Sequence, residues 1–253
     1  MDAMLPSDAL TTAFFRQEGR SPQQMRALRL TPHYTAVAEG SLLIELGHTR
    51  VLCNATIEPG VPAWLKNSGR GWVTAEYGML PRATLTRTPR ESERGRIAGR
   101  THEIQRLIGR SLRSVVDMHA LGERTVILDC DVLQADGGTR TAAITGACAA
   151  MEIAFRRLLK SGAIKKPPLR EWIAATSVGV VEGVTLLDLA YEEDAQAEVD
   201  MNLAMTESGG LVEVQATAER KTFPRERMLE MMDYAERGIR ELIAAQRKAL
   251  EEV

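Results

Sequence analysis

A glycine-rich segment, Gly137 to Thr141, combines backbone and side-chain groups suited to binding an anion. It reads Gly-Gly-Thr-Arg-Thr and lies between a predicted strand and a predicted helix. Glycine lets a backbone approach an anion closely, and the start of a helix offers unpaired N–H groups and a positive dipole. The segment has neither the Gly-Lys-Ser/Thr of a Walker A loop nor the Gly-x-Gly-x-x-Gly of a dinucleotide fingerprint. Taken alone, an ordinary glycine turn with a threonine cap is the commoner explanation.

Arginine is concentrated between residues 82 and 113, where nine arginines and three glutamates give a local charge of +6. Six of these arginines precede the predicted helix: Arg82, Arg87, Arg90, Arg94, Arg96 and Arg100. A basic loop of this kind fits electrostatic binding of a sugar–phosphate backbone. Aromatic residues make up 4% of the chain, too few for a platform that stacks several bases. A solvated loop balanced by Glu91 and Glu93 explains the charge equally well.

Acidic residues are concentrated over 181–200, which contains seven of them and no lysine or arginine. Apolar residues alternate with Asp200 and Asn202, which places these two side chains on one face of a strand. Asp194 lies a short connection earlier and could converge with Asp200. Two neighbouring carboxylates can bind Mg²⁺ beside a phosphate, or one with a raised pKa can protonate a leaving oxygen. A surface acidic loop is the alternative.

The composition narrows the class of protein. With 253 residues and 44% hydrophobic content, the chain can bury the core of one large domain or two small ones. A charged fraction of 26% makes a disordered or collagen-like chain improbable. The net charge of −2 by itself argues against a nucleic-acid partner, but it averages the basic and acidic segments above. Six of the 32 basic residues are lysine, and arginine suits bidentate phosphate recognition, although a general arginine bias of the source explains this too.

Cysteine usage and hydropathy predict a soluble cytoplasmic protein with no membrane partner. Cys53, Cys130 and Cys148 are odd in number and widely spaced, which indicates buried hydrophobic residues in a reducing compartment. Four scattered histidines make a histidine-based metal site improbable. No signal sequence and no apolar run of about 18 residues is present.

Hydrophobic periodicity predicts the elements that must position these residues. We expect strands over 42–46, 50–57, 126–133, 172–181, 184–191, 199–205 and 211–216, with a hairpin turn at 47–49. We expect helices over 104–116 and 142–159, and a long C-terminal helix from Pro224. Residues 66–100 are predicted to be mainly loop, and 1–15 a tail. This order of elements indicates an α+β fold.

Longer motifs join these segments into one pattern. They are Ala-Glu-Gly-Ser at 38–41 and the runs over 71–82, 99–108 and 128–141. Together they resemble the ribonuclease PH family of phosphorolytic 3′-exoribonucleases, over nearly the whole chain. The resemblance implies a two-layer α/β ribonuclease PH-like fold with a left-handed crossover, as a single domain over 16–253.

The resemblance also implies an activity. Inorganic phosphate would attack the terminal phosphodiester of a tRNA precursor, or of ribosomal RNA, and release a nucleoside diphosphate. The reverse reaction would add nucleotides, as in a tRNA nucleotidyltransferase of the transferase class. The family forms a ring-shaped homo-hexamer, a trimer of dimers.

Site residues follow from the matching positions. The attacking phosphate would be held by Arg100, Gly138, Thr139 and Arg140, with Arg100 counted among the catalytic residues. Asp194 and Asp200 would hold Mg²⁺ or assist the leaving 3′ oxygen, and the sequence does not separate these roles. The residues that would grip tRNA, from a neighbouring subunit, are Arg82, Arg87 and Arg90.

One departure and two alternatives complete the interpretation. The segment from Arg16 to Arg20 lacks the proline of the family's Arg-Pro-x-Gly-Arg start, and about fifteen residues precede it. A non-catalytic RNA-binding subunit of an exosome-like ring is one alternative, but it would be expected to lose the phosphate-binding arginine or the aspartate pair. A small-molecule phosphotransferase is the other, and it would bind a nucleoside triphosphate and ignore RNA.

Overall fold

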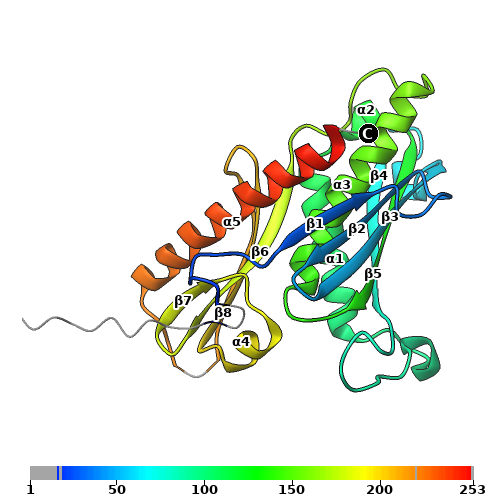
Figure 1. The fold of residues 1–253 in the computed structure, drawn as a ribbon. Coiled ribbons are helices and arrows are strands. Elements are labelled where there is room, and N and C mark those ends of the chain that lie inside the picture. The colour runs from blue at the N-terminus through cyan, green and yellow to red at the C-terminus, as the bar shows by residue number, and fades with distance from the viewer. Residues whose placement is uncertain (1–15, 17–18, 220, 252–253) are drawn as a thin grey trace, which may run out of the picture.

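Two β-sheets and their helices are arranged in layers in the computed structural model, which describes residues 16, 19–219 and 221–251 (Figure 1). The predicted tail over 1–15 lies outside the described residues. The first sheet has the order β1-β2-β3-β5-β4. Its strands are β1 (Leu28–Pro32), β2 (Gly40–Leu46), β3 (Thr49–Pro59), β4 (Trp72–Met79) and β5 (Arg124–Gln134). Neighbours are antiparallel except β4 and β5, which run parallel.

The second sheet has the order β7-β6-β8-β9 and is antiparallel throughout. Its strands are β6 (Ile173–Val181), β7 (Val184–Leu187), β8 (Val199–Thr206) and β9 (Leu211–Ala218). Every residue of β6 is buried, as expected for a continuous apolar strand in the middle of a core. Within the described part of the chain, no helix is long and apolar enough to cross a membrane.

The helices are α1 (Gly99–Ser114), α2 (Met118–Leu121), α3 (Thr139–Lys160), α4 (Tyr191–Gln196) and α5 (Arg225–Glu251), with short 3-10 turns over Ala63–Leu65 and Glu91–Arg94. Helix α3 lies between the two sheets and packs against strands of both. Fourteen of its 22 residues are buried. A Cβ added at Gly146 would lie 2.8 Å from Cys53 Sγ, so the helix and the first sheet are in close contact there. One continuous hydrophobic core includes residues from both sheets.

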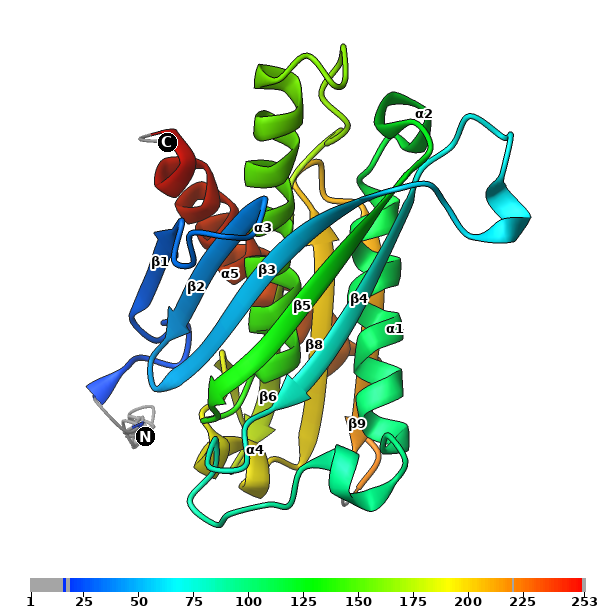
Figure 2. The same ribbon diagram turned by 90° about the vertical axis from the view of Figure 1, so that its right-hand side faces the viewer.

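The connection from β4 through α1 to β5 is left-handed, as the family resemblance implied. Figure 2 shows α1 behind the first sheet while β4 and β5 point the same way. Parallel strands joined by a crossover are right-handed in nearly all proteins, so this connection is unusual. Because β4 and β5 run parallel, the loop that follows β4 lies at the same end of the sheet as the start of α3, which follows β5 (Figure 2).

Two expectations about the elements are wrong. Residues 66–100 are not mainly loop in their first part, because β4 alternates buried Val73, Ala75 and Tyr77 with outward side chains. Glycine and arginine around this short strand hide the alternation. The strand expected over 184–191 ends at Leu187, because Asp188 has a φ of 55°. The helix α4 begins soon after it.

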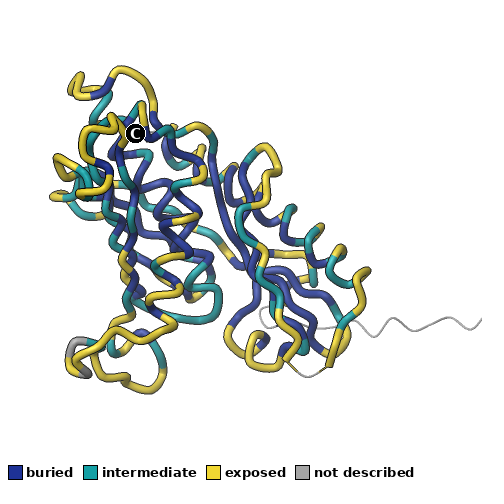
Figure 3. Tube along the Cα trace, turned by 180° about the vertical axis from the view of Figure 1, so that it is seen from behind, coloured by how far each residue is buried: buried dark blue, intermediate teal, exposed yellow. Residues whose placement is uncertain are grey.

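The other predicted elements are confirmed to within a few residues. The hairpin between β2 and β3 turns at Gly47, whose φ of 56° suits glycine. All three cysteines are free and buried, and Cys53 and Cys130 are opposite each other on β3 and β5. The loop between β4 and α1, over residues 80–98, is largely exposed (Figure 3).

Candidate active site

The start of α3 is shaped by two consecutive glycines in left-handed conformations. Gly137 has a φ of 73° and Gly138, the residue that caps the helix, a φ of 65°. A Cβ at Gly137 would lie 2.5 Å from the carbonyl oxygen of Leu189, so a larger residue has no room. The turn is therefore pressed against the segment that leads into α4, and the unpaired N–H groups at the start of α3 lie directly after it.

A cavity of about 240 Å³ lies in front of this turn. It is lined by all six residues assigned above to phosphate and to the carboxylate pair: Arg100, Gly138, Thr139, Arg140, Asp194 and Asp200. These residues come from α1, α3, α4 and β8, which are far apart in the sequence. Arg82, Arg87 and Arg90 do not line it; they are exposed in the loop between β4 and α1.

The cationic side of the cavity is supported by neighbouring side chains. Arg140 Nη1 donates to Gln215 Oε1 on β9 at 3.1 Å. The Tyr77 hydroxyl donates to Thr139 Oγ1 at 2.9 Å, and burial raises the pKa of Tyr77. The sequence analysis missed Tyr77, which contacts Thr139, and Ser177, which lines the cavity. Tyr77 lies in the 71–82 motif and could have been found there, whereas nothing in the apolar run of β6 distinguishes Ser177.

The acidic side of the cavity holds two carboxylates in different environments. Asp200 is half-buried on β8, and its Oδ2 accepts from Asn202 Nδ2 at 3.3 Å on the predicted shared face. Burial, and next the nearby Asp194 charge, raise the pKa of Asp200 to about 6. Asp194 is exposed on α4, and loss of hydration raises its pKa too, while Arg140 and Arg100 oppose the rise.

The two carboxylates fit a Mg²⁺ ion that is also bound by substrate. Asp200 Oδ1 is buried and has no hydrogen-bond partner among the residues that the structure describes, so it can accept a cation or carry a proton. Among the described residues, no group of three or more His, Cys, Asp or Glu is arranged to hold a metal. Mg²⁺ is commonly held by one or two carboxylates together with substrate phosphates, and two carboxylates in one cavity with Arg100 and Arg140 are compatible with such a site.

The raised pKa of Asp200 predicts a pH-dependent stability. The folded protein keeps this proton up to about pH 6, whereas the unfolded chain loses it near pH 4. The stability that the proton contributes is complete below pH 4 and is lost as the pH rises through 6, at a cost of up to about 3 kcal/mol. Asp200→Asn should therefore raise the free energy of unfolding at pH 8 and change it little at pH 4, in urea titrations with EDTA.

The same substitution at the exposed Asp233 controls for replacing a carboxylate by an amide. A lower stability of Asp200→Asn than of the parent protein at pH 8 would contradict the account of this carboxyl group.

Comparison with known proteins agrees with this geometry. The chain matches the family model described as "3′ exoribonuclease family, domain 1" over residues 24–156, and "domain 2" of the same family over 172–238. A relative from Solibacter usitatus (strain Ellin6076), named ribonuclease PH, is 58% identical over 236 residues. The alignment covers 93% of this chain and 99% of the relative.

Solved structures show the same fold at low sequence identity. Rice (Oryza sativa) Rrp46 has a TM-score of 0.74 and 21% identity, covering 92% of this chain and 98% of Rrp46. A chain of the Archaeoglobus fulgidus exosome, solved with RNA bound to its active site, has a TM-score of 0.75 and 22% identity, covering 90% and 91%. Because both family models match in order and a 58% identical relative spans nearly the whole chain, the chain belongs to the ribonuclease PH family of phosphorolytic 3′-exoribonucleases.

Proposed function

We propose that this chain shortens the 3′ ends of tRNA precursors, and of ribosomal RNA, by phosphorolysis. One observation carries the proposal: a cationic helix start and a carboxylate pair line the same cavity. These are groups that handle phosphate. The high identity to a relative named ribonuclease PH supports the same conclusion.

Phosphate orientation is the role proposed for Arg100, Arg140 and the first N–H groups of α3. They hold inorganic phosphate in line with the last phosphodiester of the RNA. An oxygen of this phosphate attacks the phosphorus, the bond to the preceding 3′ oxygen breaks, and a nucleoside diphosphate leaves. The catalytic effect comes from positioning and from neutralising charge in the transition state.

Asp200 and Asp194 act on the opposite side of the reacting phosphorus. With a pKa of about 6, Asp200 is partly protonated near neutral pH and can give a proton to the leaving 3′ oxygen. In the alternative arrangement Asp200 is deprotonated, and it would hold Mg²⁺ together with Asp194, which is more exposed. When bound, that ion supplies neutralisation of the negative charge on the phosphoryl oxygens.

The exposed loop between β4 and α1 grips the RNA upstream of the cavity. Arg82, Arg87 and Arg90 are exposed there, and Arg82 Nη1 donates to Leu85 O at 2.9 Å. In the proposed homo-hexamer, a trimer of dimers, this loop serves the cavity of a neighbouring subunit. The likeness of the fold to chains of an archaeal exosome core, with a TM-score of 0.72, supports a ring assembly.

The reaction is tested with a tRNA that carries a short 3′ extension, in the presence of Mg²⁺. With inorganic phosphate we expect release of nucleoside diphosphates, and without phosphate no release. Thin-layer chromatography of labelled products distinguishes these results. Release of nucleoside monophosphates would indicate hydrolysis, and no release with a normally folded protein would favour a non-catalytic ring subunit.

Loss of the Arg140 side chain should weaken phosphorolysis strongly. Removing one charged contact to a reacting phosphate costs about 2–4 kcal/mol of transition-state stabilisation, or roughly 30- to 1,000-fold in kcat/KM for phosphate. Arg240→Ala on α5 is the control, because Arg240 is exposed and pairs with Glu236. An Arg140→Ala enzyme with near-normal activity at low phosphate would show that the phosphate site is assigned wrongly.

Loss of the three loop arginines should weaken RNA binding in a salt-dependent way. Each phosphate contact contributes about 0.7 to the slope of log affinity against log salt for single strands, so the triple alanine variant should lose about 2 units of slope. The charge-matched control replaces three exposed arginines of α5, Arg225, Arg240 and Arg247. Filter binding without phosphate measures both. An unchanged slope in the loop variant would exclude these arginines from RNA binding.

A further inference from the structure

Three arginines of the N-terminal segment are buried, although guanidinium groups normally stay in water. Arg16, Arg20 and Arg26 are 4%, 6% and 3% exposed. A buried charge is tolerated when it is fully paired, and removing its partner is costly. Their partners therefore show what this segment holds in place.

Arg16 and Arg20 converge on Glu193, the residue directly before Asp194. Arg16 Nε and Nη2 each donate to one Glu193 carboxylate oxygen at 2.7 Å, and Arg20 Nη2 donates to Glu193 Oε2 at 3.3 Å. Glu193 Oε2 also accepts from the backbone N–H of Ala190 at 2.9 Å, which fixes the first turn of α4. Burial favours neutral Glu193, but the Arg16 hydrogen bonds, the Ala190 N–H and the charges of the two arginines together outweigh it and hold the Glu193 pKa below its ordinary value.

Arg26 joins the chain between β7 and α4 to the glycine turn. Its Nε and Nη2 donate to the two carboxylate oxygens of Asp188 at 2.9 and 2.6 Å, and its Nη1 donates to the carbonyl of Asp136, directly before Gly137. A Cβ at Gly138 would lie 3.0 Å from Arg26 Nη2, so the guanidinium lies directly against the turn.

Asp188 adopts a backbone conformation that needs support, since its φ is 55°. The carbonyl of Asp188 accepts from Arg16 Nη2 at 2.9 Å and from Arg20 Nη1 at 3.1 Å. The backbone N–H of Asp188 donates to the carbonyl of Ser177, a residue of the cavity wall, at 2.7 Å. Hydrogen bonds to both the carbonyl and the N–H of Asp188 thus hold the chain between β7 and α4 in place.

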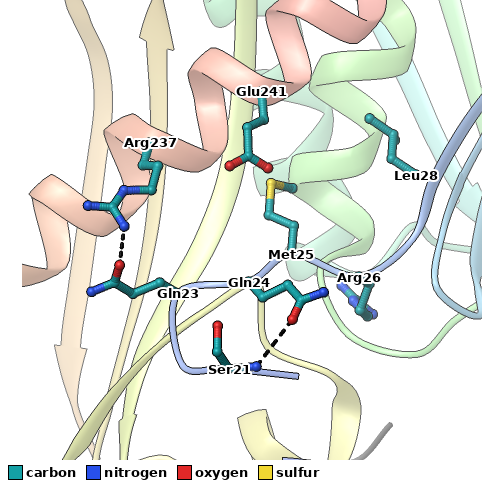
Figure 4. Close-up of a pocket in the computed structure, with 8 residues that line it drawn as sticks. All are labelled: Ser21, Gln23, Gln24, Met25, Arg26, Leu28, Arg237 and Glu241. Carbon is teal, nitrogen blue, oxygen red and sulfur yellow. Dashed lines mark hydrogen bonds between the residues drawn. The ribbon is translucent and has the colours of Figure 1, made fainter. Parts of the chain in front are cut away.

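The segment itself is anchored away from the cavity, on α5. Figure 4 shows Ser21 to Leu28 beside that helix, where Gln23 contacts Arg237 and lines a hollow of about 570 Å³. Gln23 Nε2 also donates to the Tyr234 hydroxyl at 3.1 Å. The N-terminal segment therefore links α5 to α4, through Glu193, and to the glycine turn, through Asp136.

We propose that Arg16, Arg20 and Arg26 are positioning residues, which set the distance between the Asp194 carboxylate and the phosphate-binding glycine turn. The proposal rests on the proposed function, because it assigns these arginines an effect on that reaction. None of the three lines the cavity, so each acts through the residue it holds.

The test uses Arg→Lys variants, which keep the charge but cannot form the two-pronged bond. Arg16→Lys displaces Asp194 and should lower kcat about 10- to 100-fold with the KM for phosphate unchanged. Arg26→Lys displaces the glycine turn and should raise the KM for phosphate about tenfold. Both are measured at a temperature where circular dichroism shows every variant folded.

Arg124→Lys is the matched control. Arg124 is half-buried at the other end of β5, and its guanidinium donates to the carbonyls of Leu121 and Ala163 at 2.8 and 2.9 Å. It should lower the melting temperature without changing kcat or KM. If Arg16→Lys and Arg26→Lys behave in the same way as Arg124→Lys, the arginines are merely structural and the proposal is wrong.

Two further measurements separate this proposal from the proposed function. The first is calorimetric binding of inorganic phosphate without RNA, which needs no turnover. Arg26→Lys should weaken this binding about tenfold. An unchanged Kd would overturn the role of Arg26, even in a protein that released no diphosphates. Should Arg16→Lys not fold, Arg20→Lys replaces it, because its bond to Glu193 is longer. A several-fold lower kcat would support the proposal, and an unchanged kcat would overturn it for Glu193.

Discussion

The close contact of α3 with both sheets is the constraint on which the rest of the structure depends. Small residues allow this contact: a Cβ added at Gly40 of β2 would lie 1.9 Å from the Ala150 carbonyl oxygen of α3. With α3 this close to the first sheet, its start lies where β5 ends and where β8 begins (Figure 2). The helix dipole is therefore aimed at a region where connections of both sheets meet.

Two groups of charged residues surround that region, and they differ in how fully their charges are paired. The cavity leaves its charges incompletely paired, since Asp200 has a raised pKa and a buried oxygen with no partner in the described part of the chain. The network behind it pairs nearly every group, as the two-pronged bonds of Arg16 and Arg26 show. A rigid, satisfied layer that supports reactive, unsatisfied groups is what preorganised catalysis of phosphoryl transfer requires.

The sequence was a good guide where a feature is local and a poor one where it depends on tertiary pairing. The glycine turn at Gly138 that starts α3 and the shared face of Asp200 and Asn202 follow from turn chemistry and strand alternation, and the structure contains both. The strand β4 was missed because its eight residues are surrounded by glycine and arginine. No local pattern could show that Arg16 would be buried against Glu193, 177 residues later in the chain. The net charge of −2 was misleading too, because it sums a basic and an acidic segment whose charges cancel, whereas the cavity brings together Arg100 from the first segment and Asp194 and Asp200 from the second.

The central claim is that the start of α3 binds the attacking phosphate opposite the two aspartates. The most direct test is a crystal structure of the protein with inorganic phosphate. The account predicts phosphate within hydrogen-bond distance of the Arg140 side chain and of the first backbone N–H groups of α3, on the side that faces Asp194 and Asp200. Phosphate bound elsewhere, with this cavity empty at a saturating concentration, would contradict it.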